Sequence, residues 1–571
     1  MDNNGHGSVG TREARFTSIL PPDHSGYDVQ KLFELSKMMT APFDTVKDGP
    51  DPEENLLVPA GYTYFGQFID HDLTFDSTSS LNSDDFSGPG AKDRVPTNLR
   101  TPRFDLDCVY GDGPDAQPFM YEKDGATLLT GGPGIPAHKD EHGVDVPLSA
   151  DDELLRAPNG RAIIGDKRND ENSIVNQIQQ GFIRYHNAVV EKLKADGPGK
   201  WSDKTSLFNS ARNEVRWTYQ RLVLEDFLPR IIKKEVLAGL AGASKLARQH
   251  AYVFYTEDKR SNLPREFVAA AYRFGHSGIR TGYRLNANNN MPSEPGRFLI
   301  FPASDGSGDP NAGSLLGFDP LPKHHMIDDW ARFFTDREPG FIPPEEGGRS
   351  AAADEIARPK VRLQYAYKID SSLVDPIGVL PPNVAGAGAT AEAKAAIAPK
   401  ALPDAAGRPS LALLNLLRAN MYRIHGGQAY AYLLHEKIPA AKALDPKYLV
   451  VRVPTKVANE FVFQQIDQAF LHDTPLWFYI LAEAQASVVD YIETEKKIGR
   501  GKPFPDDLLL TDGGAKTQLG WVGGRIVGEV MYGLIDSDAD SFVNKAPVGW
   551  RPMLGGNGKL VLKNLLSFQY P

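Results

Sequence analysis

Apolar residues recur at helical spacing along much of this chain. The clearest case lies within residues 172–235, where the apolar side chains fall at intervals near 3.6 residues: Ile174, Val175, Ile178, Phe182, Ile183, Val189 and Val190. Similar patterns predict a short helix near residues 27–39 and further helices over 62–75, 263–279, 410–421, 473–494 and 519–534. The chain shows no internal repeat and no alternation of strands with helices. The pattern predicts a mainly α fold with long loops and very little β structure.

The segments between these helices are long and rich in turn-forming residues. Residues 1–55 are polar and contain many Gly, Pro and Asp residues, which indicates an N-terminal arm. Residues 76–160 contain several turn clusters, and the low-complexity Ala/Gly stretch 384–402 predicts a surface loop with a short helix. We expect residues 56–571 to form one large domain, in which connections of this length usually carry function.

Composition narrows the class of protein. The 571 residues include 63 basic and 73 acidic side chains, so the net charge is −10, which argues against a nucleic-acid partner. No segment approaches 18 consecutive apolar residues, so no transmembrane segment is predicted. Residues 1–30 lack a basic start followed by an apolar run. We therefore expect no signal peptide, and a protein that is cytoplasmic or secreted by a route independent of one.

One helix face carries an unusual group of polar residues. Cys108 is the only cysteine, so a metal or cofactor would be held by histidine and oxygen ligands. On a helix over 62–75, Gln67, Asp70 and His71 share one face, because they lie one turn apart. Polar groups on an otherwise apolar segment need buried partners or a cavity. The alternative is that His71 is a core histidine whose hydrogen bonds are satisfied.

Three further segments place polar residues in similar surroundings. They contain the pairs Arg168 and Glu171, Arg273 and His276, and Asn415 and Arg418. The first pair also suits an acidic helix N-terminus, and the last suits a buried polar bridge between helices. His276 follows an apolar helical stretch, and a neutral imidazole in such a pocket is a good iron ligand when its other nitrogen has a hydrogen-bond partner.

A short acidic segment offers hard oxygen ligands. Thr101, Arg103, Asp105 and Asp107 can direct a hydroxyl, a backbone carbonyl and two carboxylates toward one point, and Asp72 could add a third carboxylate. Ca²⁺ takes six to eight such oxygen ligands. The alternative is a solvated acidic loop.

In this order the fragments resemble one family, the animal-type haem peroxidases of the peroxidase–cyclooxygenase superfamily, which includes myeloperoxidase and lactoperoxidase. The resemblance spans about residues 55–550. It rests on the motifs Gly-Gln-Phe-Ile-Asp-His-Asp (66–72), Asp-Leu-Asp-Cys-Val-Tyr-Gly (105–111), Gly-Asp-Lys-Arg-Asn-Asp-Glu (165–171), Arg-Tyr-His-Asn (184–187), Arg-Phe-Gly-His (273–276) and Leu-Asn-Leu-Leu-Arg (414–418). The absence of disulfides and of a signal peptide is similar to the bacterial members called peroxicins. The resemblance implies a large single-domain helical haem peroxidase fold.

The resemblance also implies roles for individual residues. His71 matches the distal histidine that moves a proton between the peroxide oxygens, Arg168 the distal arginine, and Gln67 the distal glutamine. His276 matches the proximal ligand of the haem iron, and Asn415 the hydrogen-bond partner of its other ring nitrogen.

Further residues match positions that hold the cofactors. Asp70 and Glu171 match the carboxylates that form ester bonds to a haem b derivative, and Arg273 and Arg418 match partners of the haem propionates. Asn172 stands where myeloperoxidase has a methionine, so no sulfonium link is expected and chloride oxidation is not predicted. The Ca²⁺ site of the family falls on Asp72, Thr101, Arg103 (through its carbonyl), Asp105 and Asp107.

The implied activity is the reduction of hydrogen peroxide, followed by oxidation of small donors such as bromide, iodide, thiocyanate or phenols through a ferryl intermediate. An alternative is a fatty-acid dioxygenase of the same superfamily, but such enzymes carry a tyrosine three residues before the proximal histidine, where this chain has Arg273. A second alternative is an inactive calcium-binding adhesion scaffold. The sequence does not specify the oligomeric state.

Overall fold

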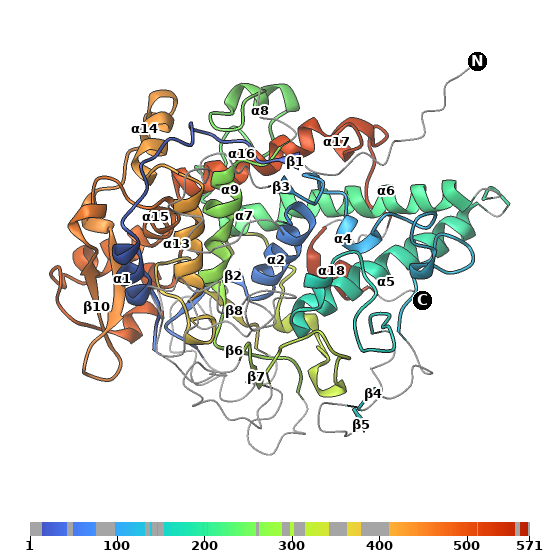
Figure 1. The fold of residues 1–571 in the computed structure, drawn as a ribbon, viewed down its shortest axis with the longest axis horizontal. Helices are drawn as coiled ribbons and strands as arrows, with labels where there is room; N and C mark the ends of the chain where they lie inside the picture. The colour runs from blue at the N-terminus through green and yellow to red at the C-terminus, as the bar shows by residue number, and fades with distance from the viewer. Residues whose placement is uncertain are drawn as a thin grey trace.

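The structure is a computed structural model that describes residues 14–42, 50–75, 97–131, 138–139, 145–146, 153–197, 199–201, 204–257, 262–287, 297–301, 314–341, 362–378, 410–510, 512–553 and 560–568. Helices dominate these residues (Figure 1). The longer ones are α1 (Val29–Met39), α2 (Gly61–Leu73), α5 (Ser173–Asp196), α6 (Lys204–Leu222), α13 (Leu411–Met421), α14 (Gly427–Lys437), α15 (Leu476–Asp490) and α16 (Trp521–Ser537). Short helices include η2 (Lys167–Asp170), α4 (Asp107–Tyr110), α7 (Leu228–Ile231), α8 (Lys245–Ala251), α9 (Arg265–Ala269), η5 (Ala271–Gly278), α17 (Phe542–Lys545) and α18 (Leu562–Leu566).

The β structure is confined to small antiparallel sheets. One sheet has three strands in the order β11 (Phe504–Pro505), β10 (Glu460–Gln465) and β9 (Val450–Pro454). The others are the two-stranded pairs β1 (Ala14–Arg15) with β3 (Thr97–Asn98), β2 (Glu54–Pro59) with β8 (Tyr365–Tyr367), β4 (His138–Lys139) with β5 (Asp145–Val146), and β6 (Gly282–Arg284) with β7 (Arg297–Leu299). The prediction of a mainly α fold with very little β structure is confirmed. No helix of the described residues combines the length and apolar character that a membrane crossing requires.

The centre of the molecule is built where α2, α5 and α6 lie against one another (Figure 1). Their contact is aromatic: Phe68 of α2 stacks on Phe182 of α5 with ring centroids 4.8 Å apart, and Tyr219 of α6 meets both rings edge-on. All three side chains are buried, and edge-to-face pairing adds to the free energy of their burial. The interface holds α2 rigidly by its apolar face, so that the polar face with His71 is positioned by the core.

The predicted helices exist, but one of them is broken. The segment 263–279 forms the short helix α9 and then, after Ala270 with φ −134° and ψ −67°, the 3₁₀ helix η5. In a 3₁₀ helix, residues i and i+3 lie on the same side, because there are three residues per turn. Arg273 and His276 therefore share one side of η5. The predicted surface loop at 384–402 lies outside the described residues.

The N-terminal segment is joined to the rest of the molecule. Helix α1 begins at the N-cap Asp28 and lies against α13 and β9. Its residues Leu32, Leu35 and Met39 are buried in the main hydrophobic core. The division of the chain at residue 55 stays a prediction.

Candidate active site

Two histidines lie on neighbouring elements: His71 of α2 is buried, and His276 of η5 is partly buried. The elements are joined by an ion pair of 3.1 Å between Asp70 Oδ2, next to His71, and Arg273 Nη1, one 3₁₀ turn before His276. A second link is the Tyr272 hydroxyl, which donates to the Gly66 carbonyl at 3.1 Å. The fold thus brings together two histidines that are 205 positions apart in the sequence, His71 and His276.

Both imidazoles have the same kind of neighbour. His71 Nδ1 lies 2.7 Å from Asn169 Oδ1, and His276 Nδ1 lies 2.8 Å from the amide nitrogen of Asn415. Within the described part of the chain, neither Nε2 has a hydrogen-bond partner. Burial lowers the pKa of His71 to about 4 and that of His276 to about 3, so both rings are neutral at pH 7. A neutral imidazole with an uncommitted nitrogen can act as a base or as a metal ligand.

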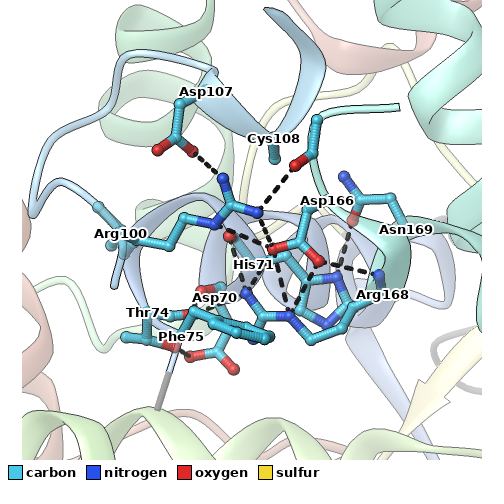
Figure 2. Close-up of polar contacts among 12 residues, drawn as sticks. Asp70, His71, Thr74, Phe75, Arg100, Asp107, Cys108, Asp166, Arg168 and Asn169 are labelled. Atoms are coloured by element: carbon cyan, nitrogen blue, oxygen red, sulfur yellow. Dashed lines mark hydrogen bonds and ion pairs between the residues drawn. The ribbon is translucent and has the colours of Figure 1, made fainter. Parts of the chain in front are cut away.

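Arg168 lies beside His71 and is held from several sides (Figure 2). Its Nη2 donates to the His71 carbonyl at 3.0 Å and to the Thr74 carbonyl at 2.6 Å, and its guanidinium lies 4.7 Å from the centre of the Phe75 ring. Asp166 accepts from its side chain at 2.7 Å and from its backbone N–H at 2.9 Å, as the N-cap of η2. The positive charge of Arg168 is therefore fixed next to α2.

A second arginine connects this charge to the acidic segment. Arg100 donates to Asp166 Oδ2 through Nε at 3.0 Å and Nη2 at 2.5 Å, and its Nη1 lies 3.2 Å from Asp107 Oδ1 (Figure 2). Burial alone would raise the pKa of Asp166, but Arg168 and Arg100 hold it well below its usual range. Asp166 is therefore an ionised carboxylate between two guanidinium groups.

Gln67 faces Glu171 and Asn172. Its Nε2 donates to Glu171 Oε1, and its Oε1 accepts from Asn172 Nδ2 at 3.1 Å. Burial raises the pKa of Glu171 to about 7, with Arg168 acting in the opposite direction. Burial also acts to raise the pKa of Asp70, but Arg273 and Arg168 lower it below its usual value. The two carboxylates predicted as haem attachment points therefore differ in charge at neutral pH.

The surroundings of His276 leave room and charge for a ligand. The guanidinium of Arg418, on the same helix as Asn415, makes no hydrogen bond or ion pair with any described residue. A Cβ atom built on Gly275 would meet no atom within 4 Å. A free guanidinium and open space beside a neutral imidazole suit a cofactor that carries carboxylates, such as haem. Arg273, by contrast, is engaged with Asp70 and with the Val268 carbonyl.

Three carboxylates gather where α2 ends, with ligand atoms of Asp72, Asp105 and Asp107 all within 4.8 Å of one another. Both oxygens of Asp72 and both of Asp107 are buried without a hydrogen-bond partner, the Arg100 contact to Asp107 being an ion pair only. Burial and mutual repulsion raise the pKa of Asp72 well above its usual range and that of Asp107 to about 7. Such orphaned acceptors fit a hard cation such as Ca²⁺.

The other two residues of the predicted calcium set lie close by. The Thr101 hydroxyl donates to Asp105 Oδ2 at 2.7 Å. The side chain of Arg103 is 55% exposed and its Nη1 lies 3.9 Å from Asp538 Oδ1, so only its backbone could face the cluster. The structure thus places Thr101 at the carboxylates.

Several residues of this site were not predicted from the sequence: Arg100, Asp166, Asn169 and Gln179. Asn169 and Asp166 flank Arg168 in a segment whose acidic and amide residues are equally typical of a helix N-terminus. Gln179 is one of several polar residues on the inner side of α5, and its role depends on which element packs there. In the sequence, the one feature that could have pointed to these four residues is that polar side chains are frequent in segments expected to be buried.

Part of the chain is similar to known proteins. Residues 79–305 match the family model described as animal haem peroxidase. A dual oxidase of Drosophila melanogaster is 26% identical over 142 residues, and human thyroid peroxidase is 29% identical over 139. These matches cover 25% and 24% of this chain but only 8% and 14% of the two relatives.

The fold is also found among solved structures. Peroxidase A from Dictyostelium discoideum superposes with a TM-score of 0.55 at 13% sequence identity. The match covers 93% of this chain and 90% of that one. The two chains therefore share one largely helical fold over nearly their full lengths.

Proposed function

Because residues 79–305 match the animal haem peroxidase family model, we propose that this chain binds haem between His71 and His276, reduces hydrogen peroxide and oxidises small donors. One observation carries the proposal. Two neutral imidazoles on contacting elements, His71 buried and His276 partly buried, each use Nδ1 for an asparagine and leave Nε2 without a partner among the described residues. Among the described residues, one ion pair joins α2 to η5, between Asp70 and Arg273.

Haem, when bound, supplies an iron centre that reacts with peroxide and accepts its oxidising equivalents. On the proximal side, His276 would ligate the iron through Nε2. This requires a proton on Nδ1, and a half-turn of the Asn415 amide presents its oxygen as the acceptor. Arg418 would pair with a propionate.

On the distal side, His71 has the properties of a general base. Its pKa of about 4 keeps the imidazole neutral at pH 7, so the ring nitrogen without a proton can take one from the peroxide oxygen that attacks and return it to the one that leaves. Arg168 is fixed beside it as a permanent positive charge, which stabilises negative charge that develops as the O–O bond breaks.

We propose bromide, iodide, thiocyanate or phenols as donors. Gln67 directs an amide N–H toward Glu171 and has a second N–H for an anion or a water molecule. The reconstituted protein should show a Soret band, and peroxide should be consumed in proportion to a phenolic donor or bromide. Peroxide-independent oxygen uptake with linoleate would instead support the fatty-acid dioxygenase alternative.

We further propose that haem becomes ester-linked through Asp70 and Glu171. The protonated fraction of Glu171 near pH 7 and the ionised Asp70 give two carboxyl groups next to the distal residues. After peroxide turnover, extraction with acidic organic solvent should leave haem on the polypeptide. Asp70→Asn and Glu171→Gln should each release more haem than the wild-type protein.

A matched control for the extraction is Glu483→Gln. Glu483 is also buried, burial raises its pKa to about 7, and it accepts from the backbone of Val522 and Gly523 rather than from the site. This variant should retain haem like the wild type. Complete release of haem from the wild-type protein after turnover would refute the ester links without touching the peroxidase proposal.

A further inference from the structure

We propose that Asn169 and Gln179 are positioning residues that hold His71 in the tautomer with its proton on Nδ1. The proposal rests on the proposed function, because it explains why Nε2 of His71 is free to act as a base. The chain of contacts begins at the backbone carbonyl of Cys108, passes through two buried amides, and ends at the imidazole.

The contacts follow one another without a gap. Gln179 Nε2 donates to the Cys108 carbonyl at 3.3 Å, Asn169 Nδ2 donates to Gln179 Oε1 at 2.8 Å, and Asn169 Oδ1 lies 2.7 Å from His71 Nδ1. The Cys108 carbonyl also accepts the backbone N–H of Asp166 at 3.1 Å. The same carbonyl therefore anchors both distal groups, His71 through two amides and Arg168 through Asp166.

The direction of every hydrogen bond is set by the first acceptor. A carbonyl oxygen can only accept, so Gln179 must turn its nitrogen toward Cys108 and its oxygen toward Asn169. Asn169 must then turn its nitrogen toward Gln179 and its oxygen toward His71. The oxygen of Asn169 can only accept, so the Nδ1 of His71 must carry the proton and Nε2 must be bare.

The reverse arrangement is excluded by burial. The side chains of Asn169 and Gln179 are fully buried, and His71 is 4% exposed, so bulk solvent does not reach their polar atoms. Reversing both amides would place the Gln179 oxygen against the Cys108 carbonyl, with two acceptors in contact and no proton between them. The tautomer of His71 is thus decided by residues that do not touch the reacting atoms.

The first test replaces Gln179 with leucine. In Gln179→Leu, Asn169 is free to turn its amide nitrogen toward His71, which moves the imidazole proton to Nε2 and removes the base. The bimolecular rate of the reaction with peroxide, followed by stopped-flow at the Soret band, should fall at least tenfold, since a general base contributes about 10²–10⁴-fold. Loss of the correct tautomer alone costs about 10⁴-fold in a serine protease.

Gln180→Leu is the matched control. Gln180 lies next in the same helix and is also buried, but its Nε2 donates to Asn176 Oδ1 at 2.6 Å rather than into the chain of contacts. Gln180→Leu should unfold at a temperature similar to that of Gln179→Leu. Its bimolecular rate with peroxide should stay within about twofold of the wild-type rate, because the general base is left in place. Equal rates for Gln179→Leu and wild type would overturn the proposal.

A second measurement needs no variant. Neutron diffraction from a perdeuterated crystal of the haem-loaded protein should show a deuteron on His71 Nδ1 and none on Nε2 at pH 7. A deuteron on Nε2, with the Asn169 nitrogen facing Nδ1, would overturn the proposal even if Gln179→Leu fails to fold. A wild-type protein that binds haem but does not react with peroxide would instead refute the proposed function, and the deuteron position would still decide the tautomer.

Discussion

At the scale of single residues, the two histidines differ in how firmly their asparagines are held. Asn169 is oriented by Gln179, whereas the side chain of Asn415 has His276 as its only hydrogen-bond partner among the described residues. Asn415 can therefore turn to suit a metal-bound ring, while Asn169 keeps the distal ring in one state. This difference matches a ligand on one side and a proton carrier on the other.

His71→Ala tests the distal assignment directly. The variant should still bind haem, because His276 is untouched, but its bimolecular rate with peroxide should fall by several orders of magnitude, as expected when acid–base and charge-stabilising groups no longer act together. Stopped-flow spectroscopy measures the rate and the Soret band measures haem binding. A rate within tenfold of wild type would show that another group moves the proton.

At the scale of elements, α2 carries the distal residues on one face and ends at the acidic cluster. Asp72 follows His71 directly, Asp105 lies just before α4, and Asp107 is the first residue of α4. Leu106, between them, has a left-handed backbone with φ 60°, which brings the two carboxylates together. A cation at this point would fasten the end of α2 to the 101–107 segment.

Removal of Ca²⁺ should therefore disturb the distal site. Chelation with EGTA should lower both the unfolding temperature and the turnover of the haem-loaded protein, because three carboxylates with oxygens within 4.8 Å of one another then repel. Added Ca²⁺ should restore both, and added Mg²⁺ should not, since Mg²⁺ demands a smaller octahedral site.

Asp72→Asn provides the matching variant for the calcium prediction. It removes one ligand charge from the cluster while keeping the size of the side chain. Its unfolding temperature should respond little to EGTA. If chelation removes the metal from the wild-type protein and leaves both the haem spectrum and the turnover unchanged, calcium does not stabilise the end of α2.

At the scale of the whole molecule, buried neutral histidines make the fold sensitive to acid. His186 lies in the core, where its Nε2 contacts the Ala126 carbonyl at 2.9 Å and its Nδ1 the Tyr110 hydroxyl at 3.1 Å. Burial lowers its pKa to about 4, against about 6.5 in the unfolded chain. Between these values the unfolded state binds the proton and the folded state does not, so stability falls as the pH falls.

The contribution of His186 alone should reach about 3 kcal/mol at pH 4 relative to pH 7. His186→Gln should make the free energy of unfolding less dependent on pH between 6.5 and 4, measured by urea unfolding at several pH values. His250→Gln, at an exposed histidine, should leave the dependence unchanged. An identical pH dependence in His186→Gln and wild type would show that His186 titrates normally.

Helical periodicity, which needs only neighbouring residues, predicted most long helices, including α1, α2, α5, α13, α15 and α16. The break at Ala270 was not predicted, because the apolar spacing of 263–279 continues across it. The β9–β10 hairpin was not predicted either, since a short strand pair depends on what it packs against.

The sequence by itself determined the helical class of the fold, the motifs that resemble one family, and the residue types available for chemistry. These follow from local spacing and from side-chain chemistry. Only the tertiary structure decided that Asp70 meets Arg273, that Arg100 lies between Asp107 and Asp166, and that Gln179 orients Asn169. The reason is physical: a hydrogen-bond direction or a shifted pKa depends on which groups folding buries together, and these groups lie far apart along the chain.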